Sequence, residues 1–100
     1  MRQSSLNLAL VGAGAWMEKY HIPAIMSLSE KWNLRIRGIW NRTIEKAEAC
    51  AATYGIPRVY ESLEELTLDS ETDCRVVVVS KTALAETLRV LTRRPIPLIS

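Results

Sequence analysis

LALVGAGAWMEKYHIPAI, residues 8–25, joins an apolar run, two glycines one residue apart and a helix-like segment. The apolar run begins at Leu6 and predicts a strand that ends at Gly12. Residues 15–32 carry apolar side chains at spacings of three and four, which predicts a helix, and Pro23 predicts a kink or a restart near His21. A strand, a glycine turn and a helix in this order raise a question: the turn either holds a pyrophosphate or is only a tight bend.

The rest of the chain continues to alternate strands and helices. Residues 34–40 alternate as a strand does, and Thr43 and Gly55 are suited to begin and end a helix over 44–54. Ser62 and Glu65 form the capping-box pattern of a short helix. A brief strand at 59–60, a valine-rich buried strand at 75–80, a helix at 83–92 and a strand from 97 complete the order. The alternation predicts an α/β fold, a doubly wound (Rossmann) parallel sheet with strand order 3-2-1-4-5 and helices on both faces.

Composition narrows the classes of protein. One hundred residues with 48% hydrophobic content suit one domain with one core. The net charge of +2 is mixed along the chain, so no nucleic-acid partner is predicted. No apolar run reaches the ~18 residues of a bilayer span and no secretory signal pattern is present, so we expect a cytoplasmic protein without a membrane partner. Cys50 and Cys74 match no metal-binding spacing, so we expect reduced thiols and no metal site.

The glycine turn, Gly12-Ala13-Gly14, lies where the predicted strand order reverses, the place at which such sheets bind ligands. Gly12 permits the tight turn, Gly14 lets backbone N–H groups approach a pyrophosphate, and the following helix presents its positive end. Met17 replaces the third glycine of the G-x-G-x-x-G pattern, and we expect it to push the helix outward. The turn is interpreted as a phosphate cradle, and a bend without a ligand stays the alternative.

The residues after the second predicted strand, Asn41, Arg42 and Thr43, indicate which dinucleotide is bound. An acidic residue here would bind the ribose hydroxyls of NAD, whereas an arginine accommodates the 2′-phosphate of NADP. The segment has no carboxylate; Arg42 can pair with a phosphate and stack on adenine, and its two neighbours can donate hydrogen bonds. NADP is therefore the predicted cofactor and NAD the second choice, with a solvated Arg42 as the alternative.

Three blocks, GAGAWMEKYHIPAI, NRTIEKAEACAATYGIPRVYESLEEL and DCRVVVVS, resemble the N-terminal NAD(P)-binding domain of the Gfo/Idh/MocA oxidoreductases, the glucose–fructose oxidoreductase and inositol dehydrogenase family. The resemblance covers residues 6–100 and implies NAD(P)-dependent oxidation or reduction of a sugar-like or polyol substrate. It implies a pyrophosphate cradle at Gly12 and Gly14, an adenine-ribose site at Asn41 and Arg42, and a path to the nicotinamide lined by Ser80 and Thr82. The remaining candidate cofactor-binding residues are Ala15, Trp16, Met17 and Thr43.

The chain departs from the family pattern in three places. Met17 stands where a small residue is usual, and the loop SKTALA, residues 80–85, lacks the proline and histidine of the family's T-P-N-x-x-H. PIPLIS places Ser100 just before the position of the E-K-P motif that holds the family's catalytic lysine. We therefore expect residues 1–100 to form a single truncated cofactor-binding domain, without the family's C-terminal substrate domain and without a catalytic residue. We expect the complete protein to be the oxidoreductase and this chain to bind the cofactor without turnover.

Other functions stay open. A non-catalytic nucleotide-binding or interaction module would explain the altered loop, and an S-adenosylmethionine methyltransferase is disfavoured because Asn41 and Arg42 replace the acidic residue that it needs. A small-molecule substrate is expected only for the complete protein, and an uncovered last strand would allow a homo-oligomer. For His21 we expect packing or a backbone hydrogen bond, and for Trp16 packing against the sheet edge rather than a position over the pyrophosphate. The glutamates at 61–65 are interpreted as a solvated helix start.

Overall fold

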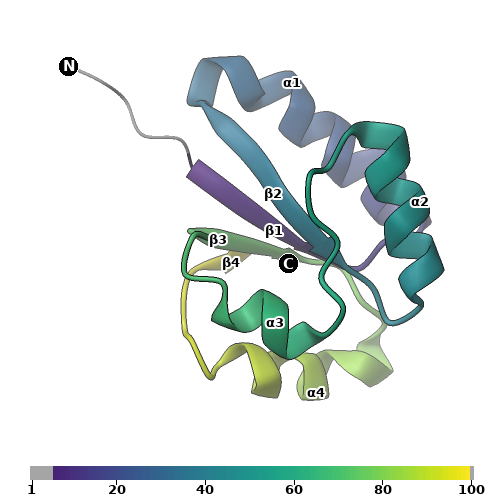
Figure 1. Ribbon diagram of the computed structural model, residues 1–100, viewed down its shortest axis with the longest axis vertical. Helices are drawn as coiled ribbons and strands as arrows, with labels where there is room; N and C mark the ends of the chain where they lie inside the picture. Colours follow the sequence, from purple (N-terminus) through teal and green to yellow (C-terminus); the bar gives the residue numbers. More distant parts are fainter. Residues whose placement is uncertain (1–5, 100) are drawn as a thin grey trace.

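A computed structural model describes residues 6–99 and shows a parallel sheet between two layers of helices (Figure 1). The strands are β1 (Leu6–Val11), β2 (Leu34–Trp40), β3 (Cys74–Val77) and β4 (Leu98–Ile99), in the order β2-β1-β3-β4. The helices are the π-helix η1 (Met17–His21), α1 (Ile22–Trp32), α2 (Ile44–Tyr54), α3 (Leu63–Leu68) and α4 (Lys81–Leu91). α1 and α2 cover one face and α3 and α4 the other. The predicted doubly wound fold is confirmed.

The third predicted strand, at 59–60, is reduced to one parallel bridge between Ile39 and Val59. The bridge lies on the outer edge of β2, which is the place that the predicted order assigned to it. It does not extend, because Ser62 already caps α3. The strand predicted at 75–80 is also shorter, spanning Cys74–Val77. The strand predicted from 97 is β4, and Ser100 lies outside the described residues.

The helix ends show where capping predictions hold. Ser62 Oγ accepts a hydrogen bond from the Glu65 N–H at 3.0 Å, which confirms the predicted N-cap. The return contact differs from a regular capping box, because Glu65 Oε1 accepts from the Glu61 N–H, one residue before the cap, at 2.9 Å. Thr43 occupies the N-cap position of α2, but its side chain makes no capping hydrogen bond there. Gly55 ends α2 in the left-handed conformation, as predicted.

The helix after the glycine turn contains the predicted irregularity, in the form of the π-helix η1. The N–H of Ile22 donates to the carbonyl of Met17, five residues back. The expected backbone hydrogen bond of His21 is present, since its Nδ1 lies 3.2 Å from the Trp16 carbonyl oxygen. The Met17 and Ile22 side chains are both fully buried, in the core between α1, α2 and the sheet.

A bulge in β2 places Arg37 in a polar network on the face of the sheet that α3 covers. The register with β1 shifts between the pairs Leu8–Ile36 and Ala9–Gly38, which leaves Arg37 as the extra residue. Arg37 Nε donates to Asp69 Oδ2 at 2.7 Å, and the Tyr60 hydroxyl donates to the same oxygen at 2.5 Å. This carboxylate therefore ties the end of α3 to β2.

The Asp69 network predicts an acid-sensitive contribution to stability. Burial alone would raise the pKa of Asp69, but the hydrogen bonds from Arg37 and Tyr60 lower it from 3.8 to about 2. The contribution is therefore fully present above pH 4 and is lost as the pH falls toward 2; it amounts to about 2 kcal/mol. We expect the difference in unfolding free energy between wild type and Asp69→Asn, measured with urea, to shrink over this range. Glu71→Gln is the control, and a difference independent of pH would contradict the assignment.

Candidate functional site

The carboxyl ends of β1, β2 and β3 open onto a hollow of about 660 Å³ that extends between the start of α3 and α4. In Figure 1 these strand ends meet where α2 and α4 begin. The predicted site residues Gly14, Asn41, Arg42 and Ser80 line the hollow. The remaining lining residues are Trp40, Glu61, Ser62, Leu63, Glu64, Val78, Val79, Ala83, Glu86, Thr87 and Val90.

Gly12 shapes the turn and tolerates no side chain. Its φ is +113°, and a Cβ at this position would lie 2.1 Å from the carbonyl oxygen of Val78. Its N–H donates to the Trp40 carbonyl at 2.7 Å, so the turn is held between the ends of β2 and β3. The expected role of Gly12 in the tight turn is confirmed.

Gly14 stands at the open side of the turn. A Cβ here would meet nothing within 4 Å. The first N–H of the helix to be bound within the chain is that of Glu18, which donates to the Gly14 carbonyl at 3.2 Å. The N–H groups of residues 14–17 therefore have no acceptor in the part of the chain that the structure describes. Unpaired N–H groups at a helix start, beside open space, fit the phosphates of a dinucleotide.

The three residues after Gly14 separate in space. Ala15 is exposed and Met17 is fully buried, and neither lines the hollow. Trp16 is 65% exposed and stacks on Tyr20, with ring centroids 4.8 Å apart. The expectation that Trp16 packs against the sheet edge is therefore wrong, because the helix turns its ring outward onto the next turn.

In the segment after β2, Asn41 is hydrogen-bonded to the chain, whereas its neighbour Arg42 is exposed. Asn41 Oδ1 accepts a hydrogen bond from the Ala13 N–H at 2.9 Å, and its Nδ2 donates to the Thr43 carbonyl at 3.0 Å. Arg42 is exposed at the rim, and among residues 6–99 it forms no ion pair. Thr43 does not line the hollow. Arg42 is thus the cation that the hollow offers to a bound anion.

The loop after β3 brings a pair of hydroxyl groups to the start of α4. Ser80 is the N-cap residue, and its Oγ lies 3.1 Å from Thr82 Oγ1. Ser80 lines the hollow and Thr82 does not. Thr82 therefore reaches the hollow only through its hydrogen bond to Ser80.

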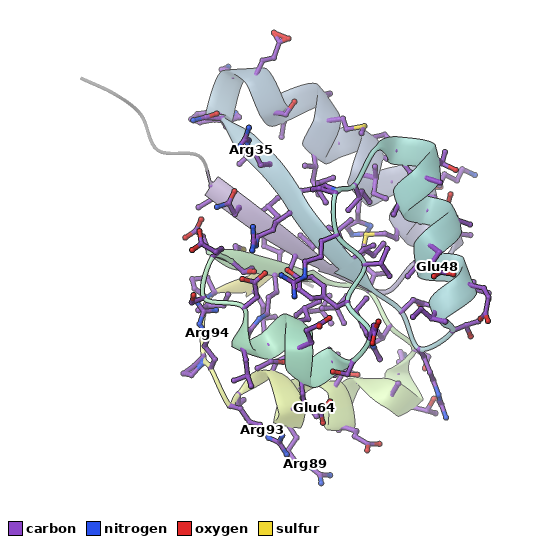
Figure 2. All side chains as sticks on the ribbon, in the orientation of Figure 1. Arg35, Glu48, Glu64, Arg89, Arg93 and Arg94 are labelled. Atoms are coloured by element: carbon purple, nitrogen blue, oxygen red, sulfur yellow. The ribbon has the colours of Figure 1, made fainter. Side chains whose placement is uncertain are left out.

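The sequence did not predict the lining residues that come from the start of α3 and from α4. Glu61 and Glu64 are exposed, as expected of a solvated helix start, but both also border the hollow. Glu64, in α3, faces Arg93, which follows the end of α4 (Figure 2); the Glu64 Oε2 atom lies 3.9 Å from the Arg93 Nη1 atom. α4 adds Ala83, Glu86, Thr87 and Val90, whose spacing of three and four was the available signal. Within the described residues, no group of three or more His, Cys, Asp or Glu is placed to hold a metal ion.

Among the helices of residues 6–99, none combines the length and the apolar character that a bilayer-spanning helix needs.

Comparisons with known proteins agree with this geometry. The family model GFO_IDH_MocA, described as an oxidoreductase family with an NAD-binding Rossmann fold, matches residues 6–98. No curated protein matches the chain. An oxidoreductase from Thermotoga maritima superposes with a TM-score of 0.84 at 25% identity, over 95% of this chain and 29% of that one.

Two further crystal structures share the fold. An NAD-binding protein from Listeria innocua has a TM-score of 0.77 at 25% identity, over 95% of this chain and 26% of that one. A myo-inositol dehydrogenase from Lactobacillus casei, in complex with NAD(H) and myo-inositol, has a TM-score of 0.82 at 20% identity. The match covers 95% of this chain and 27% of that one. The chain thus spans less than a third of the length of these proteins.

Proposed function

The chain belongs to the Gfo/Idh/MocA oxidoreductase family and contains its NAD-binding Rossmann domain, and from this premise we propose that it binds NADP in preference to NAD. We further propose that the complete protein is an NAD(P)-dependent oxidoreductase that acts on a sugar-like or polyol substrate. The observation that carries the proposal is the glycine turn: Gly14 lines the hollow at the carboxyl ends of the strands with open space beside it, and the N–H groups of residues 14–17 have no acceptor among the described residues.

The preference for NADP rests on the charges at the end of β2. Arg42 can form charge-assisted hydrogen bonds with a 2′-phosphate and present its planar guanidinium to adenine. No carboxylate stands among residues 41–43 to repel that phosphate. The glutamates of the hollow lie just before α3 (Glu61), in α3 (Glu64) and in α4 (Glu86), so the rim at the β2 end is the cationic part.

The described lining of the hollow offers a cofactor the side chains of Asn41, Arg42 and Ser80. The nicotinamide, when bound, supplies the hydride chemistry. Besides Arg42, the charged residues of the described lining are three glutamates on the α3 and α4 side, and no histidine or lysine is among them. We therefore propose that the 100-residue chain binds cofactor without turning over a substrate.

Arg42→Ala is expected to weaken NADPH binding by about 10- to 100-fold, because a charge-assisted contact to the 2′-phosphate is lost. NADH affinity should change by less than about twofold, since NADH lacks that phosphate. Quenching of tryptophan fluorescence measures both affinities, because Trp40 lines the hollow. Arg35→Ala is the matched control, as this exposed arginine lies at the other end of β2 (Figure 2).

The outcomes separate the parts of the proposal. An equal loss for both cofactors would contradict the role of Arg42 in choosing NADP. Failure of the wild-type chain to bind either cofactor at millimolar concentration would contradict the proposed function itself.

A further inference from the structure

We infer that Asn41 is a positioning residue, which holds the glycine turn in the shape that receives the cofactor phosphates. This inference rests on the proposed function. It assigns Asn41 a task different from the ribose contact that its place after β2 suggests.

The side-chain amide of Asn41 joins three segments of the chain. Its oxygen accepts from the N–H of Ala13, in the turn between β1 and the first helix, at 2.9 Å. Its nitrogen donates to the carbonyl of Thr43, where α2 begins, at 3.0 Å. One planar group at the end of β2 thus fixes the turn on one side and the Arg42 loop on the other.

The turn has few other restraints. Ala13 lies between two glycines, the residues with the greatest backbone freedom. The only other backbone hydrogen bonds that the described residues give to this segment are from the Gly12 N–H to Trp40 and from the Glu18 N–H to the Gly14 carbonyl. Ala13 is 4% exposed, so loss of the Asn41 oxygen would leave a buried N–H without a partner. The turn would then leave this conformation part of the time.

The chemistry selects asparagine at this position. An amide accepts at one atom and donates at the other, as the two contacts require. Aspartate could still accept from Ala13, but it would turn a carboxylate toward the Thr43 carbonyl and toward any 2′-phosphate at Arg42. Alanine could do neither. The two variants therefore separate the hydrogen bond to the turn from the charge beside the ribose.

The first measurement is amide hydrogen exchange of Ala13 in the ligand-free chain, followed by NMR. In Asn41→Ala we expect the Ala13 N–H to exchange about tenfold faster, which corresponds to the loss of one hydrogen bond. In Asn41→Asp, the exchange rate should stay near that of wild type, because an acceptor remains. Asn7→Ala is the matched control: it removes an asparagine whose Nδ2 donates to the Glu71 carbonyl at 3.0 Å, at the amino end of β1.

The second measurement is the titration of the same variants with NADH and NADPH. Asn41→Ala should weaken both by a similar factor of about 5 to 10, because the turn contacts the part that the two cofactors share. Asn41→Asp should keep NADH affinity within about threefold and lose NADPH affinity. This pattern differs from that of Arg42→Ala, which affects NADPH alone.

Each outcome decides a separate point. Unchanged Ala13 exchange in Asn41→Ala, or a loss confined to one cofactor, would overturn the positioning role. Accelerated exchange together with no binding of either cofactor by the wild type would leave the hydrogen bond standing and overturn the proposed function.

Discussion

Gly12→Ala is expected to destabilise the chain by roughly 3–5 kcal/mol, the largest effect of any substitution in the site. A side chain must adopt φ near +113°, and its Cβ would start 2.1 Å from the Val78 carbonyl oxygen. The obstacle is backbone at the end of β3, which cannot move aside as a flexible side chain does. Relief would require the turn to part from the sheet, with loss of the hydrogen bond from the Gly12 N–H to Trp40. Urea unfolding of the purified variant measures the loss.

Gly14→Ala is the matched control for this prediction. Gly14 has no neighbour within 4 Å of the added Cβ, so its unfolding free energy should stay within about 0.5 kcal/mol of wild type. Its methyl group would project at the open side of the turn, and cofactor binding should weaken. Equal stability losses at the two glycines would contradict the account of Gly12.

Arg75→Ala is expected to cost about 4 kcal/mol. Arg75 is 1% exposed, and it donates from Nη1 to the Leu91 carbonyl at 3.0 Å and from Nη2 to the Thr67 carbonyl at 2.9 Å. Both carbonyls lie in the last turns of helices, α4 and α3, so two negative helix ends balance this buried cation in place of a carboxylate. Burial, reinforced by the nearby Arg94, lowers the pKa of Arg75. Truncation leaves a cavity and two carbonyls without a donor.

Arg75→Lys tests the geometry of this arrangement, because an ammonium cannot reach two carbonyls as a guanidinium fork does. We expect it to recover less than half of the loss in urea unfolding. Arg89→Ala, an exposed arginine on α4 (Figure 2), should change stability by less than about 0.5 kcal/mol. Full recovery by lysine would show that charge alone suffices.

Local patterns predicted the parts of this molecule that local forces determine. The alternation in 34–40, the capping box at Ser62 and the glycine after α2 led to elements with the correct type and nearly correct bounds. The glycine turn and Arg42 were predicted because their spacing relative to a strand end carries the chemistry. A strand was predicted at 59–60, but only a bridge at Val59 is present. Two extended residues do not show that the next helix begins directly after them.

The remaining features depend on contacts between distant residues. Nothing near Asn41 in the chain indicates that its oxygen meets Ala13, 28 positions earlier. Arg75 is the first residue of the predicted valine-rich strand, and nothing in the local sequence indicates that its guanidinium is buried between the ends of α3 and α4. The α4 contribution to the hollow was also missed, since an amphipathic helix pattern does not distinguish a face against the core from a face against a cavity.

The π-helix at Met17–His21 has a consequence for how this chain tolerates changes of length. A residue added to a regular α-helix rotates everything beyond it by about 100°, which would move the apolar face away from the sheet. Here the five-residue step from Met17 to Ile22 absorbs one residue locally, and both side chains still reach the core. Insertions between the glycine turn and α1 can therefore be accommodated in this one turn.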